Sequence, residues 1–329
     1  MLDRESSLVG ACCRRTRRFS AWLPLVAILG MQPALAAAPA PARIDLDRFE
    51  ALKKAVALAD GEHLAYVSMG DPAGVPVVLI HGYTDNARDW VPLIPYLSPR
   101  FHLIVVDLRG HGRSGKPECC YTRWDFAYDI KLLLDALKVR RADIVGHSLG
   151  SIVTQTFAEA WPERTRRVVL ISSSGGPRAG TPPPQPAYDW ATQIRQLQEP
   201  IEPDSPFMIE WWSSPTPVDE DFIRRQRRDA ARIPLRVWLA VLDQGIEPMR
   251  EGGDLRRTLP RLTAPALLLW GSKDPLIEEE GRQTLREALP QAQVKVFDGL
   301  GHNPFWEDPR ACAEVINAFL TAAPEADRS

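Results

Sequence analysis

The chain has 329 residues, of which 45% are hydrophobic and 25% are charged, and its formal net charge is −2. This length and composition fit a large core, formed by one large α/β domain with an insertion or by two domains. The near-neutral charge gives no electrostatic reason to expect binding to nucleic acid or to an anionic membrane surface.

Residues 1–36 have the pattern of an export signal. Four arginines between positions 14 and 18 precede an apolar stretch at 21–31, and the triplet at 34–36 fits an A-x-A cleavage site. The apolar stretch is shorter than a transmembrane helix normally requires. A membrane anchor that is retained after export is the alternative interpretation. We therefore expect an exported protein, periplasmic or secreted, without stable membrane insertion after the signal is removed. The arginine pair at 17–18 leaves the Sec and twin-arginine routes both open.

Three cysteines follow the signal, namely Cys119, Cys120 and Cys312. An odd number leaves at least one thiol unpaired, and adjacent cysteines pair only with strain, so we expect reduced or partly buried thiols at 119 and 120 rather than a functional redox pair. No Cys/His spacing resembles a metal site. The sequence therefore predicts no metal and no cofactor.

After a predicted linker at 37–48, strands alternate with helices. Two short strands at 54–58 and 63–69 meet at Asp60-Gly61, which favours a hairpin. The later strands are continuously apolar, which is typical of a parallel sheet covered on both faces. They are predicted at 76–80, 101–106, up to 145, 167–172, 266–270 and 294–297, with helices at 89–97, 124–138, 150–161, 278–289 and 308–320.

The alternation stops in a segment rich in proline, arginine and tryptophan, where only helices near 188–198, 219–230 and 233–243 are expected. We predict a helical cap at 176–258, inserted between core segments at 49–175 and 259–322, with a short tail at 323–329. The fold class is therefore α/β, with a mostly parallel central sheet.

The sequence from Gly146 to Gly150 matches G-x-S-x-G between a buried strand and a helix. A reversal this sharp holds the central Ser148 in a strained conformation, with its hydroxyl exposed at the end of the sheet. The helix that follows directs its free backbone N–H groups towards the same point. Ser148 is therefore the candidate nucleophile.

A serine hydroxyl needs a base, and the base needs a group that orients it. Asp274 follows the strand at 266–270, and His302 follows the strand at 294–297, so both lie at the carboxyl ends of strands. The backbone N–H groups of Leu149 and Tyr83 are the expected oxyanion donors. Asp107, a competing carboxylate after an earlier strand, is expected instead to tie down the turn at 109–112.

Five motifs resemble the α/β-hydrolase fold superfamily, of the serine esterase and lipase type with a helical cap domain. They are His81-Gly82, residues 107–114, 146–150 and 271–275, and Gly301-His302, which occur in the family's order within about 62–320. The resemblance implies Ser148 as nucleophile, His302 as base and Asp274 as orienting acid. Relatives that open epoxides or remove halides use a carboxylate nucleophile, so Ser148 disfavours those reactions.

The expected activity is hydrolysis of a small carboxylic ester or lactone through an acyl-enzyme. Hydrolysis of carbon–carbon bonds in aromatic ring-cleavage products is the first alternative, a cofactor-free peroxidase-like activity is a weaker one, and a noncatalytic ligand receptor is an alternative of a different class. The pocket is expected to be apolar or aromatic, and no partner protein is implied. Its predicted lining residues are His81, His147, Trp211, Trp212, Trp238 and Phe305.

Overall fold

A computed structural model describes residues 41–176, 189–246, 248 and 255–323, so the predicted signal and most of the predicted tail lie outside the described residues. Residues 41–329 belong to one compact unit. The described part begins with helix α1 (Leu46–Ala51), whose first turn is capped by the Asp45 side chain accepting from the Arg48 N–H. The predicted linker at 37–48 is therefore wrong from residue 46 onwards, because Asp45 is a good N-cap.

Eight strands form a single sheet in the order β1-β2-β4-β3-β5-β6-β7-β8. The hairpin of β1 and β2 is antiparallel, as predicted, and β2 pairs antiparallel with β4, whereas all later neighbours pair in parallel. The mostly parallel sheet is therefore confirmed. The strands are β1 (Lys54–Ala57), β2 (His63–Gly70), β3 (Val75–Ile80), β4 (Phe101–Asp107), β5 (Ala142–His147), β6 (Thr165–Ile171), β7 (Ala266–Gly271) and β8 (Gln293–Phe297).

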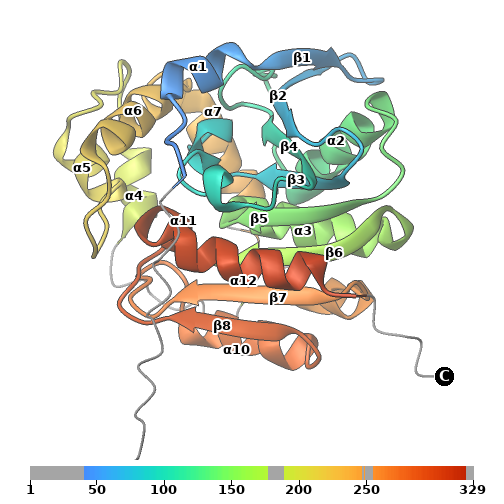
Figure 1. The fold of residues 1–329 in the computed structure, drawn as a ribbon. Helices are drawn as coiled ribbons and strands as arrows, with labels where there is room; N and C mark the ends of the chain where they lie inside the picture. Colours follow the sequence, from blue (N-terminus) through green and yellow to red (C-terminus); the bar gives the residue numbers. More distant parts are fainter. Residues whose placement is uncertain (1–40, 177–188, 247, 249–254, 324–329) are drawn as a thin grey trace, which may run out of the picture. The chain divides into compact units, whose positions relative to one another are not determined.

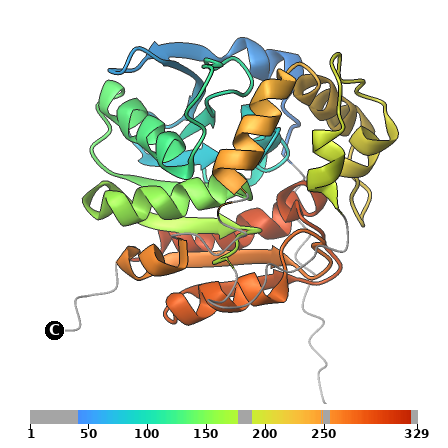
Figure 2. The same ribbon diagram turned by 180° about the vertical axis from the view of Figure 1, so that it is seen from behind.

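Helices cover both faces of the sheet (Figures 1 and 2). Helices α2 (Arg123–Ala136), α3 (Leu149–Ala160) and α10 (Glu279–Ala288) lie on one face, and α12 (Pro309–Thr321) lies on the other. The strands β3 to β7 are almost completely buried between these layers, as continuous apolar strands require. The carboxyl ends of these strands are thereby held in one rigid row.

Short helices between β6 and β7 make up the described part of the predicted cap. Four of them, α4 (Trp190–Arg195), α5 (Pro206–Trp211), α6 (Glu220–Ala230) and α7 (Leu235–Val241), are followed by a π-helical turn at Leu242–Ile246 and by α9 (Leu255–Thr258). No strand occurs in the described residues of this segment, in agreement with the prediction. The α5 helix was not predicted. Its Trp211 packs on Phe207 of the same helix and on Trp190 of α4.

Two local predictions are wrong. The helix expected at 89–97 is two 3-10 turns, Ala87–Trp90 and Ile94–Tyr96, because Pro92 and Pro95 lack the N–H groups that a continuous helix needs. The expectation of reduced thiols fails as well, since Cys119 and Cys120 are joined in a disulfide. Cys312 is a free thiol, buried in α12.

Three short elements remain. The 3-10 turns Pro162–Arg164 and Leu259–Arg261 come before β6 and β7, and the short helix α11 (Pro304–Glu307) lies between β8 and α12. Within the described ranges, no helix has the length and apolar character needed to cross a membrane.

Asp143 on β5 is a buried carboxylate, and neither of its oxygens has a hydrogen-bond partner, although the Arg166 guanidinium lies 3.4 Å away. Burial raises the pKa of Asp143 to about 6, because it outweighs the attraction of Arg166. The native state therefore binds a proton on Asp143 more tightly than the unfolded chain does. The protonated carboxyl group stabilises the native state at low pH, and this contribution is lost as the pH rises from about 4 to about 6.

We expect Asp143→Asn to change stability in a pH-dependent way. At pH 8 the variant should be more stable than the wild type by about 1–3 kcal/mol, because the buried charge is removed, whereas near pH 4 the two should be equal. Urea unfolding at both pH values measures the difference. A difference that is the same at pH 4 and pH 8 would contradict this assignment.

Candidate active site

The turn between β5 and α3 presents Ser148 at the carboxyl end of the sheet. Ser148 has φ 49° and ψ −119°, a backbone conformation that L-residues rarely adopt and that costs about 1–3 kcal/mol. Its N–H donates to the Ile171 carbonyl at 2.9 Å, which fixes the turn against β6. The strained serine predicted from the sequence is therefore present.

Two glycines allow the close packing of this turn. A Cβ atom on Gly146 would lie 2.2 Å from the Gly150 carbonyl oxygen, and one on Gly150 would lie 2.2 Å from the Ile80 carbonyl oxygen of β3. Both contacts are with backbone, which cannot rotate away. The glycine positions of the motif are therefore required by contact between β5, α3 and β3.

Gly150→Ala should accordingly damage both stability and function. The added methyl group must push α3 away from β3, at a cost of about 1–3 kcal/mol. The shift also moves Ser148 and the Leu149 N–H, and a displacement of about 1 Å in such a site can lower the rate about 10²-fold. Thermal unfolding and ester hydrolysis measure the two effects. An active variant of unchanged stability would show that the turn tolerates a side chain.

His302 and Asp274 form a hydrogen-bonded pair beside this turn. The His302 Nδ1 lies 2.9 Å from Asp274 Oδ1, which also accepts the Leu276 N–H at 2.9 Å. Burial favours the neutral form of Asp274, yet the His302 charge and hydrogen bond, together with the Leu276 N–H, hold the pKa of this carboxyl below its usual value. Asp274 is therefore an ionised acceptor that keeps the His302 proton on Nδ1 and leaves Nε2 as the basic nitrogen.

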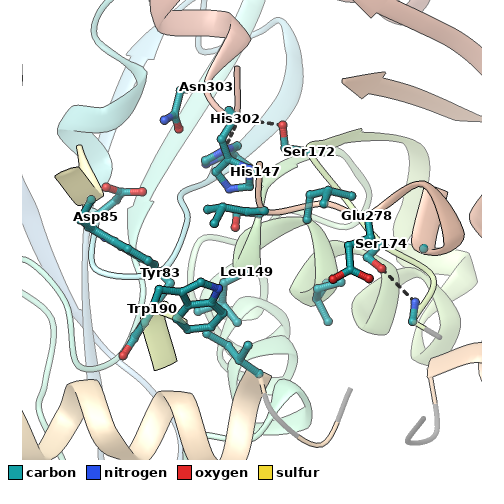
Figure 3. A pocket seen from close by; sticks show the side chains of 18 of the residues that line it. Tyr83, Asp85, His147, Leu149, Ser172, Ser174, Trp190, Glu278, His302 and Asn303 are labelled. Carbon is teal, nitrogen blue, oxygen red and sulfur yellow. Dashed lines mark hydrogen bonds between the residues drawn. The ribbon is translucent and has the colours of Figure 1, made fainter. Parts of the chain in front are cut away.

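Three contacts hold the backbone that carries His302. The Ser172 hydroxyl donates to the His302 carbonyl at 2.7 Å, and His147 Nε2 lies 3.0 Å from the same oxygen (Figure 3). The Gly301 N–H donates to the Glu307 carboxylate at 2.9 Å, and Glu307 in turn accepts the Thr216 hydroxyl from the cap. The position of the base therefore depends on β5, β6, α11 and the cap together.

The two predicted oxyanion donors flank the serine. Leu149 is the first residue of α3, where backbone N–H groups have no partner within the helix. Tyr83 follows β3, and its hydroxyl donates to the Trp238 carbonyl of α7 at 2.6 Å. Both residues line the same cavity as Ser148 and His302. The two residues predicted as oxyanion donors therefore lie at the wall of the cavity that Ser148 lines.

The cavity has a volume of about 180 Å³, and both the core and the cap contribute to it (Figure 3). The cap supplies mostly apolar and aromatic walls, and the core supplies the polar groups and further aliphatic side chains. Its lining includes Trp190, Trp211, Trp212, Ile246 and Leu255 of the cap, with Ile152, Leu276, Ile277, Asp85, Glu278 and Glu280 of the core. An apolar chamber with a few polar groups is typical of sites for small molecules.

The six predicted lining residues divide into two groups. His147, Trp211 and Trp212 line the cavity, whereas His81, Trp238 and Phe305 do not. His81 Nε2 accepts the Leu108 N–H at 3.0 Å, and its Nδ1 lies 2.7 Å from the Gly82 carbonyl, so both ring nitrogens serve the backbone. Trp238 lies behind Tyr83, and Phe305 stacks on Trp90 with ring centroids 4.7 Å apart. These three residues support the cavity wall from behind.

Two kinds of charged group near the site have structural roles. Asp107 accepts the N–H groups of Ala87 and Arg113 and pairs with Lys53 at 2.8 Å, so it ties down the neighbouring turn as predicted. Arg224 and Arg227 of α6 pair with the surface carboxylates Asp221 and Asp204, and no arginine of α6 lines the cavity.

Sequence reasoning missed two carboxylates that lie beside His147. Asp85 and Asp89 lie in the loop after β3, and their side chains meet His147. Burial raises the pKa of Asp85 to about 7 against the lowering effect of His302, and burial and then Asp85 raise the pKa of Asp89 well above its usual value. The signal available was the spacing after His81-Gly82, because residues in that loop lie at the carboxyl end of β3.

Comparisons with known proteins agree with this architecture. A family model described as "alpha/beta hydrolase fold" matches residues 75–309. Pimeloyl-[acyl-carrier protein] methyl ester esterase of Pectobacterium carotovorum is 29% identical over 251 residues, covering 75% of this chain and 94% of that protein. Lipase 1 of Psychrobacter immobilis is 25% identical over 294 residues, covering 81% and 83%.

A solved structure of a hydrolase also has a similar fold. A hydrolase from Pseudomonas aeruginosa superimposes with a TM-score of 0.67 at 25% identity, covering 82% of this chain and 98% of that one. The strand order, the strained serine turn and the family match over residues 75–309 lead to one conclusion. This chain belongs to the α/β-hydrolase fold family.

Proposed function

We propose that this protein is an exported serine hydrolase that cleaves small carboxylic esters or lactones. Ser148 is the nucleophile, His302 is the base and Asp274 orients the base. The observation that carries the proposal is the Asp274–His302 hydrogen bond of 2.9 Å at the wall of a cavity that the strained Ser148 also lines. The esterase and lipase among the relatives support the same class of reaction.

The reaction follows from the positions of these groups. His302 Nε2 accepts the hydroxyl proton as the Ser148 oxygen bonds to the substrate carbonyl carbon, and the Leu149 and Tyr83 N–H groups stabilise the resulting oxyanion. His302 then gives the proton to the leaving alcohol as the ester bond breaks, which leaves an acyl-enzyme on Ser148. A water molecule, activated by His302, releases the acid and restores the serine.

The first experiment is hydrolysis of p-nitrophenyl acetate, butyrate and octanoate by the mature protein. We expect turnover that is lost in Ser148→Ala, with a chain-length preference that reports the size of the cavity. A noncatalytic receptor would bind such esters without turnover, and Ser148→Ala would bind them equally well. A folded protein inactive on these esters and on lactones would contradict the proposal.

Export is the second part of the proposal, and residues 1–36 support it through their arginines, apolar stretch and A-x-A triplet. Expression of the full chain in a Gram-negative host should place the protein outside the cytoplasm, with Ala37 as the new N-terminal residue. N-terminal sequencing of the fractionated protein measures both. A full-length protein that is retained in the cytoplasm would contradict export.

A further inference from the structure

Three ionisable side chains converge behind the catalytic histidine. Asp85 and Asp89 come from the loop and 3-10 turn after β3, and His147 is the last residue of β5. One potential ligand atom from each lies within 4.8 Å of the other two. Asp89 and His147 are essentially inaccessible, and Asp85 is 7% exposed where it reaches the cavity (Figure 3). The cluster is therefore buried, with one edge on the cavity.

His147 directs a bare lone pair into this cluster. Its Nε2 lies 3.0 Å from the His302 carbonyl oxygen, which can only accept, so Nε2 carries the proton and Nδ1 does not. Nδ1 is buried and has no hydrogen-bond partner among the described residues. A neutral imidazole whose second nitrogen donates to a carbonyl is how proteins prepare a metal-binding histidine.

Asp89 is likewise without a partner, since neither carboxylate oxygen accepts a hydrogen bond within the described part of the chain. No lysine or arginine is paired with Asp85 or Asp89 in the described ranges. Trp212 hydrogen-bonds the Asp85 carboxylate, but two buried carboxylates without a positively charged partner remain unfavourable when both are ionised. The cluster therefore needs either protons or a cation.

The distance between Asp89 and His147 favours a cation over a proton shared by these two groups. A proton shared between two of these groups would bring their heavy atoms to about 2.5–3.2 Å. Asp89 Oδ2 instead lies 3.9 Å from His147 Nδ1. Two ligands on one ion, with bonds of about 2.0–2.2 Å, lie about 3–4.4 Å apart, depending on the angle between them. The Asp89–His147 distance falls within that range, and all three ligand atoms lie within 4.8 Å of one another.

We propose that Asp85, Asp89 and His147 bind one divalent transition-metal ion, of which Zn²⁺ and Mn²⁺ fit the one-nitrogen, two-oxygen ligand set best. Imidazole with carboxylates suits these ions, whereas Ca²⁺ and Mg²⁺ prefer oxygen ligands alone. The two carboxylates neutralise the ion. Asp85 lies at the cavity wall, so the ion can enter from the cavity. The bound ion fixes His147, and through its N–H the His302 carbonyl, so it positions the base without taking part in the reaction.

The test uses the mature protein after treatment with a chelator. Titration with ZnCl₂ or MnCl₂, followed by calorimetry and thermal unfolding, should show one bound ion per chain and a melting temperature raised by several degrees. Asp89→Asn should weaken binding at least about 100-fold. Asp143→Asn is the matched control, because it removes a buried carboxylate outside the cluster whose oxygens likewise accept no hydrogen bond from the described residues, and it should leave the affinity unchanged.

Two additions keep the test decisive. Asp85→Asn is a second variant in case Asp89→Asn fails to fold, and it should weaken binding similarly. Substitution with Co²⁺ should give visible absorption bands that neither cluster variant shows. No stoichiometric binding by the folded wild type, or equal binding by wild type and both cluster variants, would overturn the proposal. None of these measurements depends on ester hydrolysis, so the site can fail while the proposed reaction stands.

Discussion

Ser148→Ala is expected to lower kcat/KM for p-nitrophenyl butyrate by about 10⁴–10⁶-fold, because no other group can form the acyl-enzyme. The residual rate would come from binding and from the Leu149 and Tyr83 N–H groups, which remain in place. Alanine at position 148 keeps the strained backbone conformation with φ 49°, so the thermal stability of the protein should change little. Steady-state kinetics together with thermal unfolding measure both quantities.

A matched control for this variant lies in the same cavity. Ser174 also lines the cavity. Its hydroxyl accepts the Gly176 N–H at 3.1 Å and has no part in the proposed reaction of Ser148 with His302. Ser174→Ala should therefore retain kcat within about tenfold. If the two alanine variants lost similar activity, or if Ser148→Ala kept more than about one per cent, Ser148 would not be the nucleophile.

Asp274→Asn is expected to lower kcat by about 10²–10⁴-fold, and Asp274→Ala by more. The Leu276 N–H donates to Oδ1, so the asparagine carbonyl should stay at that position and still accept from His302 Nδ1. The asparagine variant thus loses the negative charge that stabilises the His302 cation but keeps its orientation. The alanine variant loses both. The values of kcat for the two variants measure this order.

Asp298→Asn is the matched control for this pair, because Asp298 follows the neighbouring strand β8 and its side chain accepts the Ser272 hydroxyl rather than a histidine N–H. This exposed side chain lies outside the cavity lining, so the variant should keep near wild-type kcat. Equal activity of the Asp274→Asn, Asp274→Ala and wild-type proteins would remove Asp274 from the mechanism. An alanine variant more active than the asparagine variant would contradict the role of Leu276.

The central sheet and the turn at Ser148 were predictable because each depends on local sequence. Continuous apolar runs predict buried parallel strands, and the glycines at 146 and 150 predict a turn in which no side chain fits. Asp274 and His302 could be selected because residues directly after parallel strands meet at one edge of the sheet. Proximity in this fold follows from topology, which the order of elements specifies.

The cavity wall was less predictable, because it depends on how segments distant in sequence pack against one another. Trp211 and Trp238 both lie in the cap, yet only Trp211 reaches the cavity, since Trp238 is covered by Tyr83 and Phe207. No periodicity distinguishes these two tryptophans. The Asp85–Asp89–His147 cluster was missed for the same reason, because its members come from β5 and from an irregular loop whose 3-10 turn directs Asp89 inwards.

Covalent labelling tests directly whether Ser148 is the nucleophile. The mature protein would be treated with diethyl p-nitrophenyl phosphate, which transfers a diethylphosphoryl group to an activated serine, and the product would be digested and sequenced by mass spectrometry. We expect one diethylphosphoryl group per chain, on the peptide that contains Ser148, with loss of esterase activity in proportion to labelling. Labelling confined to another residue, or an unlabelled Ser148 in a folded and active protein, would contradict it.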